Sequence, residues 1–339
     1  MMNGRRIDLD VLYNNQNITT EIEDFIDSLS FTDNLSGQAD DISINIGDRE
    51  RRWSNQWRPY KGASLQVSLK ISEHWWETGA TNRKLGYFEI DDLGMNGPPT
   101  KISVKGTSIP ESSSLKGEKK SKAWEKTNLK KIAEDVAKKN KLTLHFSVQE
   151  NPEYERVDQE SQTDIAFLYK LCTDAGLALK IVNKSITILD EIKLEAGEAV
   201  TTIFHTDDRI KDYSAKDVLG NIYKSCKVSY TDPKSKKTLS YTFTPKNPPP
   251  TARILTVNEQ VTSQKAAIDL AKKSLRNVNK EATTFSMKLA GFLAVYAGQC
   301  VNLKDFGAFD GKYLITSVGG SLGSGSETSL ELRKCLEGY

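Results

Sequence analysis

Histidine is scarce in this chain of 339 residues, which contains only His74, His145 and His205. None of the three lies in an H-E-x-x-H pattern or at ligand spacing from a cysteine, so the usual zinc sites are not expected. A P-loop and a G-x-G-x-x-G turn after a strand are also missing. We therefore expect no catalytic residue, no metal and no cofactor, and predict that the chain is not an enzyme.

An excess of charge of one sign is also missing, because 47 Lys and Arg residues are balanced by 45 Asp and Glu residues. A broad nucleic-acid-binding face needs surplus basic charge to replace counterions, so sequence-specific nucleic-acid binding is not expected. No apolar run approaches the ~20 residues of a membrane span, and the first residues lack the apolar core of a signal peptide. We expect no membrane partner.

Cysteine is rare and is never arranged as a C-x-x-C pair. Each cysteine lies in an apolar strand or helix pattern, where a free thiol behaves as a small buried hydrophobic group. We predict buried, reduced thiols and assembly in a reducing cytosol. The four residues are Cys172, Cys226, Cys300 and Cys335.

Alternating apolar and polar residues predict several short antiparallel strands in residues 1–112. Glycine-rich and proline-rich turns separate these strands, which is typical of a β-barrel or sandwich. Residues 48–61, between Gly47 and Gly62, have no such alternation and are predicted to form a loop. We interpret residues 1–112 as a first β-barrel domain.

The pattern changes after a predicted linker, which includes the Lys-rich residues 116–122. Apolar residues at helical spacing predict one helix from Leu129 to Ala137. A second helix is predicted around Phe167, with Ser161 as its N-cap, and Gly176 should end it. Residues 177–181 and 186–188 then form a predicted hairpin. These elements make residues 120–195 a small α/β module.

Strands return in residues 196–339, which we interpret as a second β-barrel domain with a helical insertion near residues 262–279. The order of strands and glycines in this region matches the order in residues 42–104. In both, a strand is followed by two strands that begin with glycine, a glycine-rich loop and a last strand. The sequence therefore predicts a mainly β fold with two related β-barrel domains separated by an α/β module.

Four tryptophans in the first region are the candidate interface residues: Trp53, Trp57, Trp75 and Trp76. Large aromatic side chains dominate the area buried in cores and protein interfaces. The same cluster could instead stack on sugar rings. The alternative hypothesis is therefore a cell-wall or carbohydrate-binding module.

Three stretches, in this order, resemble the phage late control gene D protein family. Residues 31–65 resemble its N-terminal barrel, with Trp57-Arg58-Pro59 after Trp53. Residues 162–177 are similar to its central helix, with the pattern (S/T)-D-x-x-F-L-x-x-L-x-x-x-x-G. Residues 298–332 resemble its second barrel, with Asp310-Gly311-Lys312-Tyr313-Leu314-Ile315 at their centre. Together these stretches span nearly the whole chain.

The resemblance implies a structural baseplate hub of a contractile phage tail or a phage-tail-like bacteriocin, similar to the hub part of type VI secretion spike proteins. It implies a homotrimer whose two barrels per chain form a pseudo-sixfold ring between a hexameric tail tube and a trimeric spike. Other implied partners are a baseplate wedge or LysM-bearing hub-associated protein and the tape measure. The expected location is the tail baseplate of a particle assembled in the bacterial cytoplasm. In the alternative hypothesis, the chain is a cell-wall or carbohydrate-binding module of a tail tip.

Overall fold

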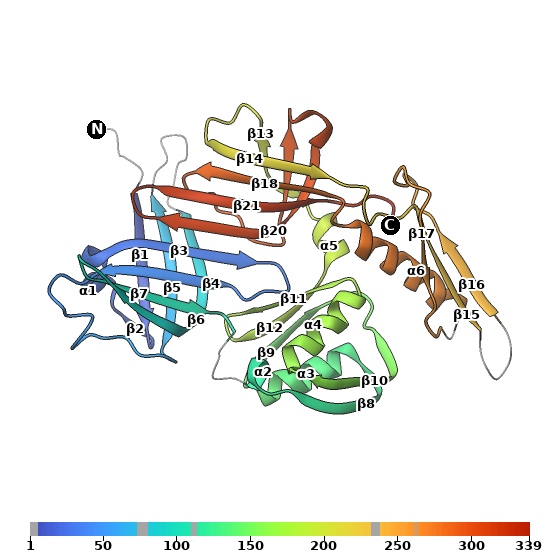
Figure 1. The fold of residues 1–339 in the computed structure, drawn as a ribbon, viewed down its shortest axis with the longest axis horizontal. Helices are drawn as coiled ribbons and strands as arrows, with labels where there is room; N and C mark the ends of the chain where they lie inside the picture. Colours follow the sequence, from blue (N-terminus) through green and yellow to red (C-terminus); the bar gives the residue numbers. More distant parts are fainter. Residues whose placement is uncertain (1–5, 73–80, 110–113, 232–237, 262) are drawn as a thin grey trace.

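The computed structural model describes residues 6–72, 81–109, 114–231, 238–261 and 263–339. The protein is mainly β, with four of its helices between residues 114 and 196 (Figure 1), and the predicted mainly β character of the fold is confirmed. One large sheet of 13 strands runs through both the N-terminal and the C-terminal parts of the chain, and three smaller sheets accompany it.

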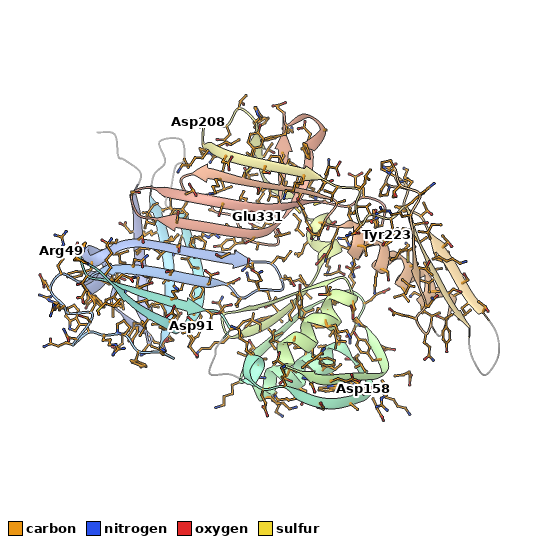
Figure 2. All side chains as sticks on the ribbon, viewed as in Figure 1. Arg49, Asp91, Asp158, Asp208, Tyr223 and Glu331 are labelled. Atoms are coloured by element: carbon orange, nitrogen blue, oxygen red, sulfur yellow. The ribbon has the colours of Figure 1, made fainter. Side chains whose placement is uncertain are left out.

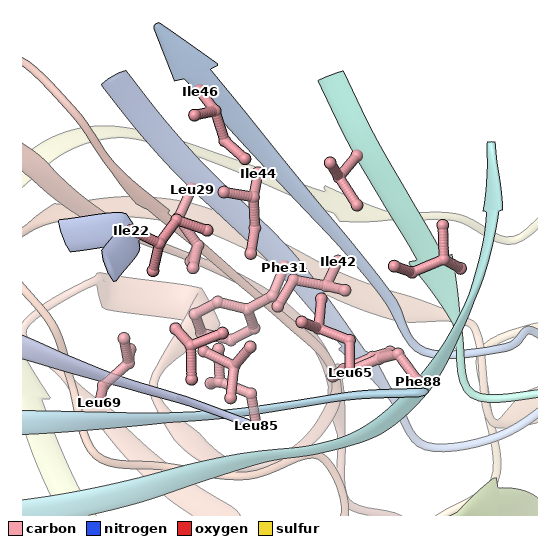
Figure 3. Close-up of a cluster of buried hydrophobic side chains, with 14 of the residues drawn as sticks. Ile22, Leu29, Phe31, Ile42, Ile44, Ile46, Leu65, Leu69, Leu85 and Phe88 are labelled. Atoms are coloured by element: carbon pink, nitrogen blue, oxygen red, sulfur yellow. The ribbon is translucent and has the colours of Figure 1, made fainter. Parts of the chain in front are cut away.

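The first β-unit contributes one half of the large sheet. Its elements are β1 (Arg6–Tyr13), β2 (Gln16–Asn17), α1 (Thr19–Ile22), η1 (Glu23–Phe25), β3 (Ile26–Asn34), β4 (Asp41–Gly47), β5 (Ser64–Ser72), β6 (Thr81–Asn96) and β7 (Lys101–Thr107). Alternate residues of these strands point inward and are buried; in β4, for example, they are Ile42, Ile44 and Ile46. Figure 3 shows this aliphatic core closing over Phe31 and Phe88.

The central α/β unit follows. Its elements are α2 (Ser114–Gly117), β8 (Lys120–Asn128), α3 (Leu129–Lys139), β9 (Thr143–Ser147), β10 (Glu153–Gln162), α4 (Asp164–Asp174), β11 (Leu177–Val182), β12 (Ser185–Asp190) and α5 (Glu191–Ala196). Strands β11 and β12 pair as predicted, with Leu179 opposite Ile188. Asn183 and Lys184 both have positive φ, as the two-residue turn of such a hairpin requires.

Two predictions for this unit are wrong. Ser161 does not cap α4, because it belongs to β10; Thr163 is the N-cap, and its hydroxyl accepts a hydrogen bond from the Ala166 amide at 3.3 Å. The predicted Lys-rich linker is also wrong from Lys120 onward, because β8 pairs with β10 as a two-stranded ribbon. The alternating lysines of β8 hide this strand, since they give it no apolar face except at Trp124.

The second β-unit completes the large sheet. Its elements are β13 (Ala199–Phe204), β14 (Ile210–Asp217), β18 (Thr283–Ala290), β19 (Cys300–Lys304), η2 (Gly307–Phe309), β20 (Gly311–Leu322) and β21 (Ser326–Lys334). The glycine-rich loop was predicted at residues 319–325. Gly319 and Gly320 instead lie within β20, so the loop is shorter than predicted. Between β14 and β18 lies an inserted unit: β15 (Ser225–Thr231), β16 (Thr238–Phe243), β17 (Ile254–Val257) and α6 (Gln264–Asn279). These three strands form their own sheet, on which α6 packs.

The two β-units have the same strand order. In the first, the order across the sheet is β3-β4-β7-β6-β5-β1, and in the second it is β14-β18-β21-β20-β19-β13. Each strand occupies the same place along the chain in its unit, apart from the inserted unit. One pair differs in direction, because β1 runs antiparallel to β5 whereas β13 runs parallel to β19.

The match extends to single residues. A β-bulge interrupts β6 between Ile90 and Asp92, and one interrupts β20 between the corresponding residues Ile315 and Ser317. A second bulge interrupts β3 between Ile26 and Ser28, and its counterpart interrupts β14 between Ile210 and Asp212. Bulges are specific features that re-aim strands, so two at matching positions establish the internal repeat. We propose that the two β-units are the domains predicted at residues 1–112 and 196–339, and that the central unit is the module predicted at residues 120–195.

Candidate functional site: the aromatic loop and the joints between units

The predicted interface residues Trp53 and Trp57 lie in the loop between β4 and β5, which we call the aromatic loop (residues 48–63). Asp48 shapes this loop, because its carboxylate accepts hydrogen bonds from the Trp53 and Ser54 amides, both at 2.9 Å. The Trp53 ring packs edge-on against Phe25 at 6.1 Å and against Trp57 at 5.5 Å. Figure 2 shows Arg49, next to Asp48, at the outer end of the first β-unit.

The two tryptophans have different roles in this loop. Trp53 is 5% exposed and belongs to the core of the first β-unit, whereas Trp57 is 41% exposed. Their rings are nearly perpendicular, at 79°, and the Arg52 guanidinium covers Trp57 at 5.4 Å from the ring centre. Trp75 and Trp76 lie outside the described residues, so the interface role of all four stays a prediction.

A mostly apolar cavity of about 360 Å³ lies under the aromatic loop, bounded by Ile44, Ile46, Trp53, Trp57, Tyr60 and their neighbours. Trp53 Nε1 is buried beside it and has no hydrogen-bond partner among the described residues. The cavity marks the place where the aromatic loop closes over the end of the first β-unit.

Strands β20 and β3 pair in antiparallel fashion, with Ser317 opposite Asn34 and Leu322 opposite Leu29; we call this pairing the joint. The loop between β18 and β19 reinforces it, because Phe292 stacks on Phe31 at 6.1 Å and enters the core of the first β-unit. Arg83 is buried between the units and donates a hydrogen bond to the Leu293 carbonyl at 3.0 Å. The joint therefore makes one continuous sheet from the two β-units.

A charged cluster connects the first β-unit to the central unit. Lys180 of β11 donates hydrogen bonds to the carboxylates of Asp33 and Asp40, and to the Asn34 carbonyl at 2.8 Å. Burial raises the pKa of Asp40 to about 6, although the nearby charge of Lys180 opposes this shift. Asp33 also accepts a hydrogen bond from the Ala297 amide at 3.1 Å, so the second β-unit is attached to the same cluster.

A second charged cluster, which we call the α5 cluster, joins three units around two glutamates of α5. Glu195 pairs with Arg276 of α6 at 2.5 Å and with Arg333 of β21, and Leu336 donates its amide to the same carboxylate. Glu191 pairs with Arg333 at 2.9 Å and with Lys280 at 3.0 Å. Because Glu191 and Glu195 are buried, the pairs fix the inserted unit against the second β-unit.

Neither charged cluster was predicted from the sequence. Their members are far apart in the chain, by 147 positions for Asp33 and Lys180 and by 142 positions for Glu191 and Arg333, so no local pattern indicates that they meet. The one available signal was the presence of Glu and Arg inside otherwise apolar strand and helix patterns. Such positions are rarely charged unless the charges are paired.

The histidines and the other side chains that could bind a metal do not form a cluster among the described residues. Among the described residues, no group of three or more His, Cys, Asp or Glu side chains could hold a metal ion. No helix in the described part of the chain is long and apolar enough to cross a membrane. His145 is exposed on β9, His205 contacts Tyr213 at 3.1 Å, and His74 lies outside the described residues.

Residues 319–323 have the G-x-S-x-G spacing of a serine nucleophile, a motif that the sequence-based prediction wrongly excluded. That motif requires a sharp turn from a strand into a helix. Ser321 instead lies within β20, where it is paired with Ser30 of β3. The spacing is therefore part of the joint and does not form a nucleophile site.

The cysteines are free thiols, as predicted. Cys172, Cys226 and Cys300 are buried, whereas Cys335 is half-buried, so the predicted burial is only partial there. Burial raises the pKa of the Cys172 thiol to about 12 and that of Cys226 to about 11. Both thiols are thus protonated and unreactive at neutral pH.

Comparison with known proteins gives two kinds of relative. No protein-family model matches the chain. The probable baseplate hub protein of Escherichia phage 186 is 27% identical over 190 residues, which are 56% of this chain and 45% of that protein. The probable baseplate hub protein of Escherichia phage P2 is 24% identical over 192 residues, 56% of this chain and 46% of its own length. The matches thus span about half the length of these curated relatives.

Solved structures match over almost the whole chain. A tail protein from Neisseria meningitidis MC58 superposes with a TM-score of 0.72 at 14% identity, covering 97% of this chain and 96% of that one. A 43 kDa tail protein of prophage MuSo2 from Shewanella oneidensis gives 0.71 at 13% identity, covering 97% and 98%. A component of the E. coli type VI secretion system gives 0.59 at 11% identity, covering 99% and 78%. The chain therefore has the fold of phage tail proteins, and its sequence relatives confirm the predicted resemblance to baseplate hub proteins.

Proposed function

We propose that this protein is a structural hub of a tail baseplate. The similarity to two probable baseplate hub proteins supports this role, and the fold shared with phage tail proteins along nearly the whole chain agrees with it. Hub relatives point to a non-enzymatic role. The chain would then act through its shape and its contacts, with no reaction of its own.

The internal repeat is the observation that carries this proposal. Two β-units with the same strand order and two matching bulges allow three chains to present six similar units. A homotrimer would then form a pseudo-sixfold ring that fits a hexameric tail tube on one face and a trimeric spike on the other. The central and inserted units interrupt the sixfold repeat, so they are suited to contacts that follow the threefold symmetry.

Further partners follow from the same position in the particle. We propose that the hub contacts a wedge or LysM-bearing hub-associated protein around its outside, and the tape measure along the tube axis. The particle would be a phage virion or a phage-tail-like bacteriocin, with the hub located in its tail baseplate and assembled in the bacterial cytoplasm. The non-enzymatic role is part of this proposal.

Negative-stain electron microscopy together with native mass measurement tests the proposal. We expect three-chain rings with a central channel, from the chain alone or after addition of a spike protein from the same particle. A chain cut after Glu195 should form no ring, because it lacks the second β-unit. Channel-free discs would count against the hub, and a monomer that binds purified peptidoglycan and ignores the spike would favour the carbohydrate-binding alternative.

A further inference from the structure

The joint uses one strand from each β-unit, and the repeat supplies a second copy of both. Strand β20 of the second β-unit corresponds to β6 of the first, because both carry a bulge at the matching position. Strand β3 of the first β-unit likewise corresponds to β14 of the second. One chain therefore contains the joint once as a formed pair, and once as two strands that do not meet each other.

Both unused strands have a free edge among the described residues. Of the strands that the structure describes, β14 is the last on its side of the sheet and pairs only with β18. Strand β6 pairs with β5 only up to Glu89, and from Asp92 to Asn96 it has β7 on one side and no described strand on the other. In β20, the corresponding edge is the one occupied by β3. Figure 2 places Asp91 of β6 and Asp208, just before β14, on opposite sides of the sheet.

We propose that β6 of one copy pairs antiparallel with β14 of a second copy of this chain, in the register of the joint. We call this pairing the seam. In the joint Gly320 lies opposite Phe31, and the corresponding residues of the seam are Met95 and Ala215. The seam as a whole places Asp92 opposite Val218, Leu93 opposite Asp217, Gly94 opposite Lys216, Met95 opposite Ala215 and Asn96 opposite Ser214.

The sizes of the opposed side chains fit this register. At Gly320 of the joint, an added Cβ would collide with the Phe31 ring, so a large residue on β3 requires a glycine on β20. In the seam the large and small residues change strands. The large residue, Met95, lies on β6, which corresponds to β20, and the small residue, Ala215, lies on β14, which corresponds to β3. Cross-strand pairs of this kind are the unit of sheet stability, so a large-with-small exchange conserves the packed volume.

The chemistry of a second pair is also conserved. Val318 lies opposite Asp33 in the joint, and the seam places an aliphatic residue, Leu93, opposite an acidic one, Asp217. Glycine follows the aliphatic residue in both strands, as Gly319 in β20 and Gly94 in β6. A register shifted by one residue would break both matches, because it turns every side chain to the other face.

Apolar side chains are exposed on both edges of the seam. Met95 is 67% exposed on β6, while Tyr213 and Val218, in and just after β14, are 44% and 48% exposed. Unpaired strand edges with exposed apolar residues are sites of strand addition unless something covers them. The two edges differ from each other, so the contact is head-to-tail and generates a closed ring or an open filament. The seam rests on the repeat, whereas closure after three copies rests on the proposed function.

Paired cysteines test the seam and its register. The variant M95C/A215C should form disulfides between copies under mild oxidation, giving a ladder on a non-reducing gel that ends at three chains. The matched control M95C/S214C moves one cysteine to the opposite face of β14 and should give at least tenfold less cross-linked product. The single variants M95C and A215C should give no cross-linked product. They control for disulfides that form through the native cysteines.

Each outcome decides between the seam and the ring. A ladder that ends at three chains supports both, and a ladder that continues past three supports the seam and overturns the three-copy ring. Native trimers without cross-linking in M95C/A215C overturn the seam and leave the ring. A wild-type chain that stays monomeric at high concentration, with no cross-linking, overturns both. Equal cross-linking of the two double variants overturns the register.

A charge substitution provides an independent measurement. M95K places a charge at the centre of the seam but on an exposed position of the monomer, so the monomer should fold and association should weaken at least tenfold. Ile254 of β17 is 55% exposed and lies outside the seam, so I254K is the matched control and should associate like the wild type. Unchanged association of M95K, with circular dichroism showing a native fold, contradicts the seam.

Discussion

The first and second β-units have the same strand order but fill their interiors differently. The first is packed mainly with aliphatic side chains, among them Ile42, Ile44 and Leu65, around Phe88. The second has an aromatic cluster in which Phe285 contacts Phe306 at 5.1 Å and stacks on Tyr213 at 5.7 Å. The strand order and two of the bulges are thus the same in both units, while the core side chains are exchangeable so long as they fill the space.

The connections differ more than the strands. The link from β3 to β4 is short, whereas the corresponding link from β14 to β18 carries the whole inserted unit. The aromatic loop covers the end of its own β-unit, but the corresponding loop of the second β-unit sends Phe292 into the first. The two β-units therefore differ most in the loops that connect their strands. Loops of this kind often carry the specific contacts with partners.

The largest effect should come from breaking the α5 cluster, which the first β-unit does not share. Glu195→Ala leaves Arg276 and Arg333 buried with fewer partners, and losing one member of a buried ion pair costs about 3–5 kcal/mol. Urea unfolding measures this loss in the free energy of unfolding. The control Lys101→Ala removes an exposed pair with Asp27 and should cost at most about 1 kcal/mol. Equal losses would show that the α5 cluster contributes no more than a surface pair.

The next effect tests whether the two β-units unfold together. Phe285 is buried in the second β-unit, so Phe285→Ala should cost about 3–5 kcal/mol. All five tryptophans precede residue 125, so their fluorescence does not report on the second β-unit directly. Because the joint makes one sheet, the fluorescence and circular dichroism midpoints should fall by the same amount. Ile42→Ala, at the corresponding position of the first β-unit, is the matched control. A fluorescence midpoint that does not move in Phe285→Ala would show independent units.

The charged cluster around Lys180 should make stability depend on pH. The folded-state pKa of Asp40, about 6, lies above its ordinary value of 3.8, so the folded chain holds this proton more tightly than the unfolded chain. Ionisation of Asp40 therefore removes stability as the pH rises from about 4 to 6, by at most about 3 kcal/mol. Asp40→Asn should lose this part of the pH profile. Parallel urea-unfolding profiles of the two proteins from pH 4 to 7 would refute this account.

The smallest effect should come from the exposed side of the aromatic loop. Trp57→Ala removes a half-exposed ring that contacts Trp53 edge-on, and such a ring pair contributes about 0.5–1.5 kcal/mol. Trp53→Ala removes a buried core residue and should cost about 3–5 kcal/mol. Thermal unfolding followed by circular dichroism compares the two. A Trp57→Ala variant as unstable as Trp53→Ala would mean that Trp57 belongs to the core.

The sequence predicted what depends on periodicity and failed where the partners are distant. The hairpin after Gly176, the helix from Leu129 and the repeat were predictable, because each follows from residues close together in the chain. The strand β8 was missed, because its lysines cover the pattern that marks a buried strand. The two charged clusters and the Phe292 contact could not be found, because they join residues that only the folded chain brings together.

The joint also has a consequence for the order in which the chain folds during synthesis. Strand β3 ends at Asn34, while its partner β20 ends at Leu322, so almost the whole chain must be made between them. At about 5–20 residues per second, the ribosome needs roughly 15–60 s to deliver β20 after β3 has emerged. Throughout that interval the nascent first β-unit exposes the edge of β3 and the Phe31 position that Phe292 later covers.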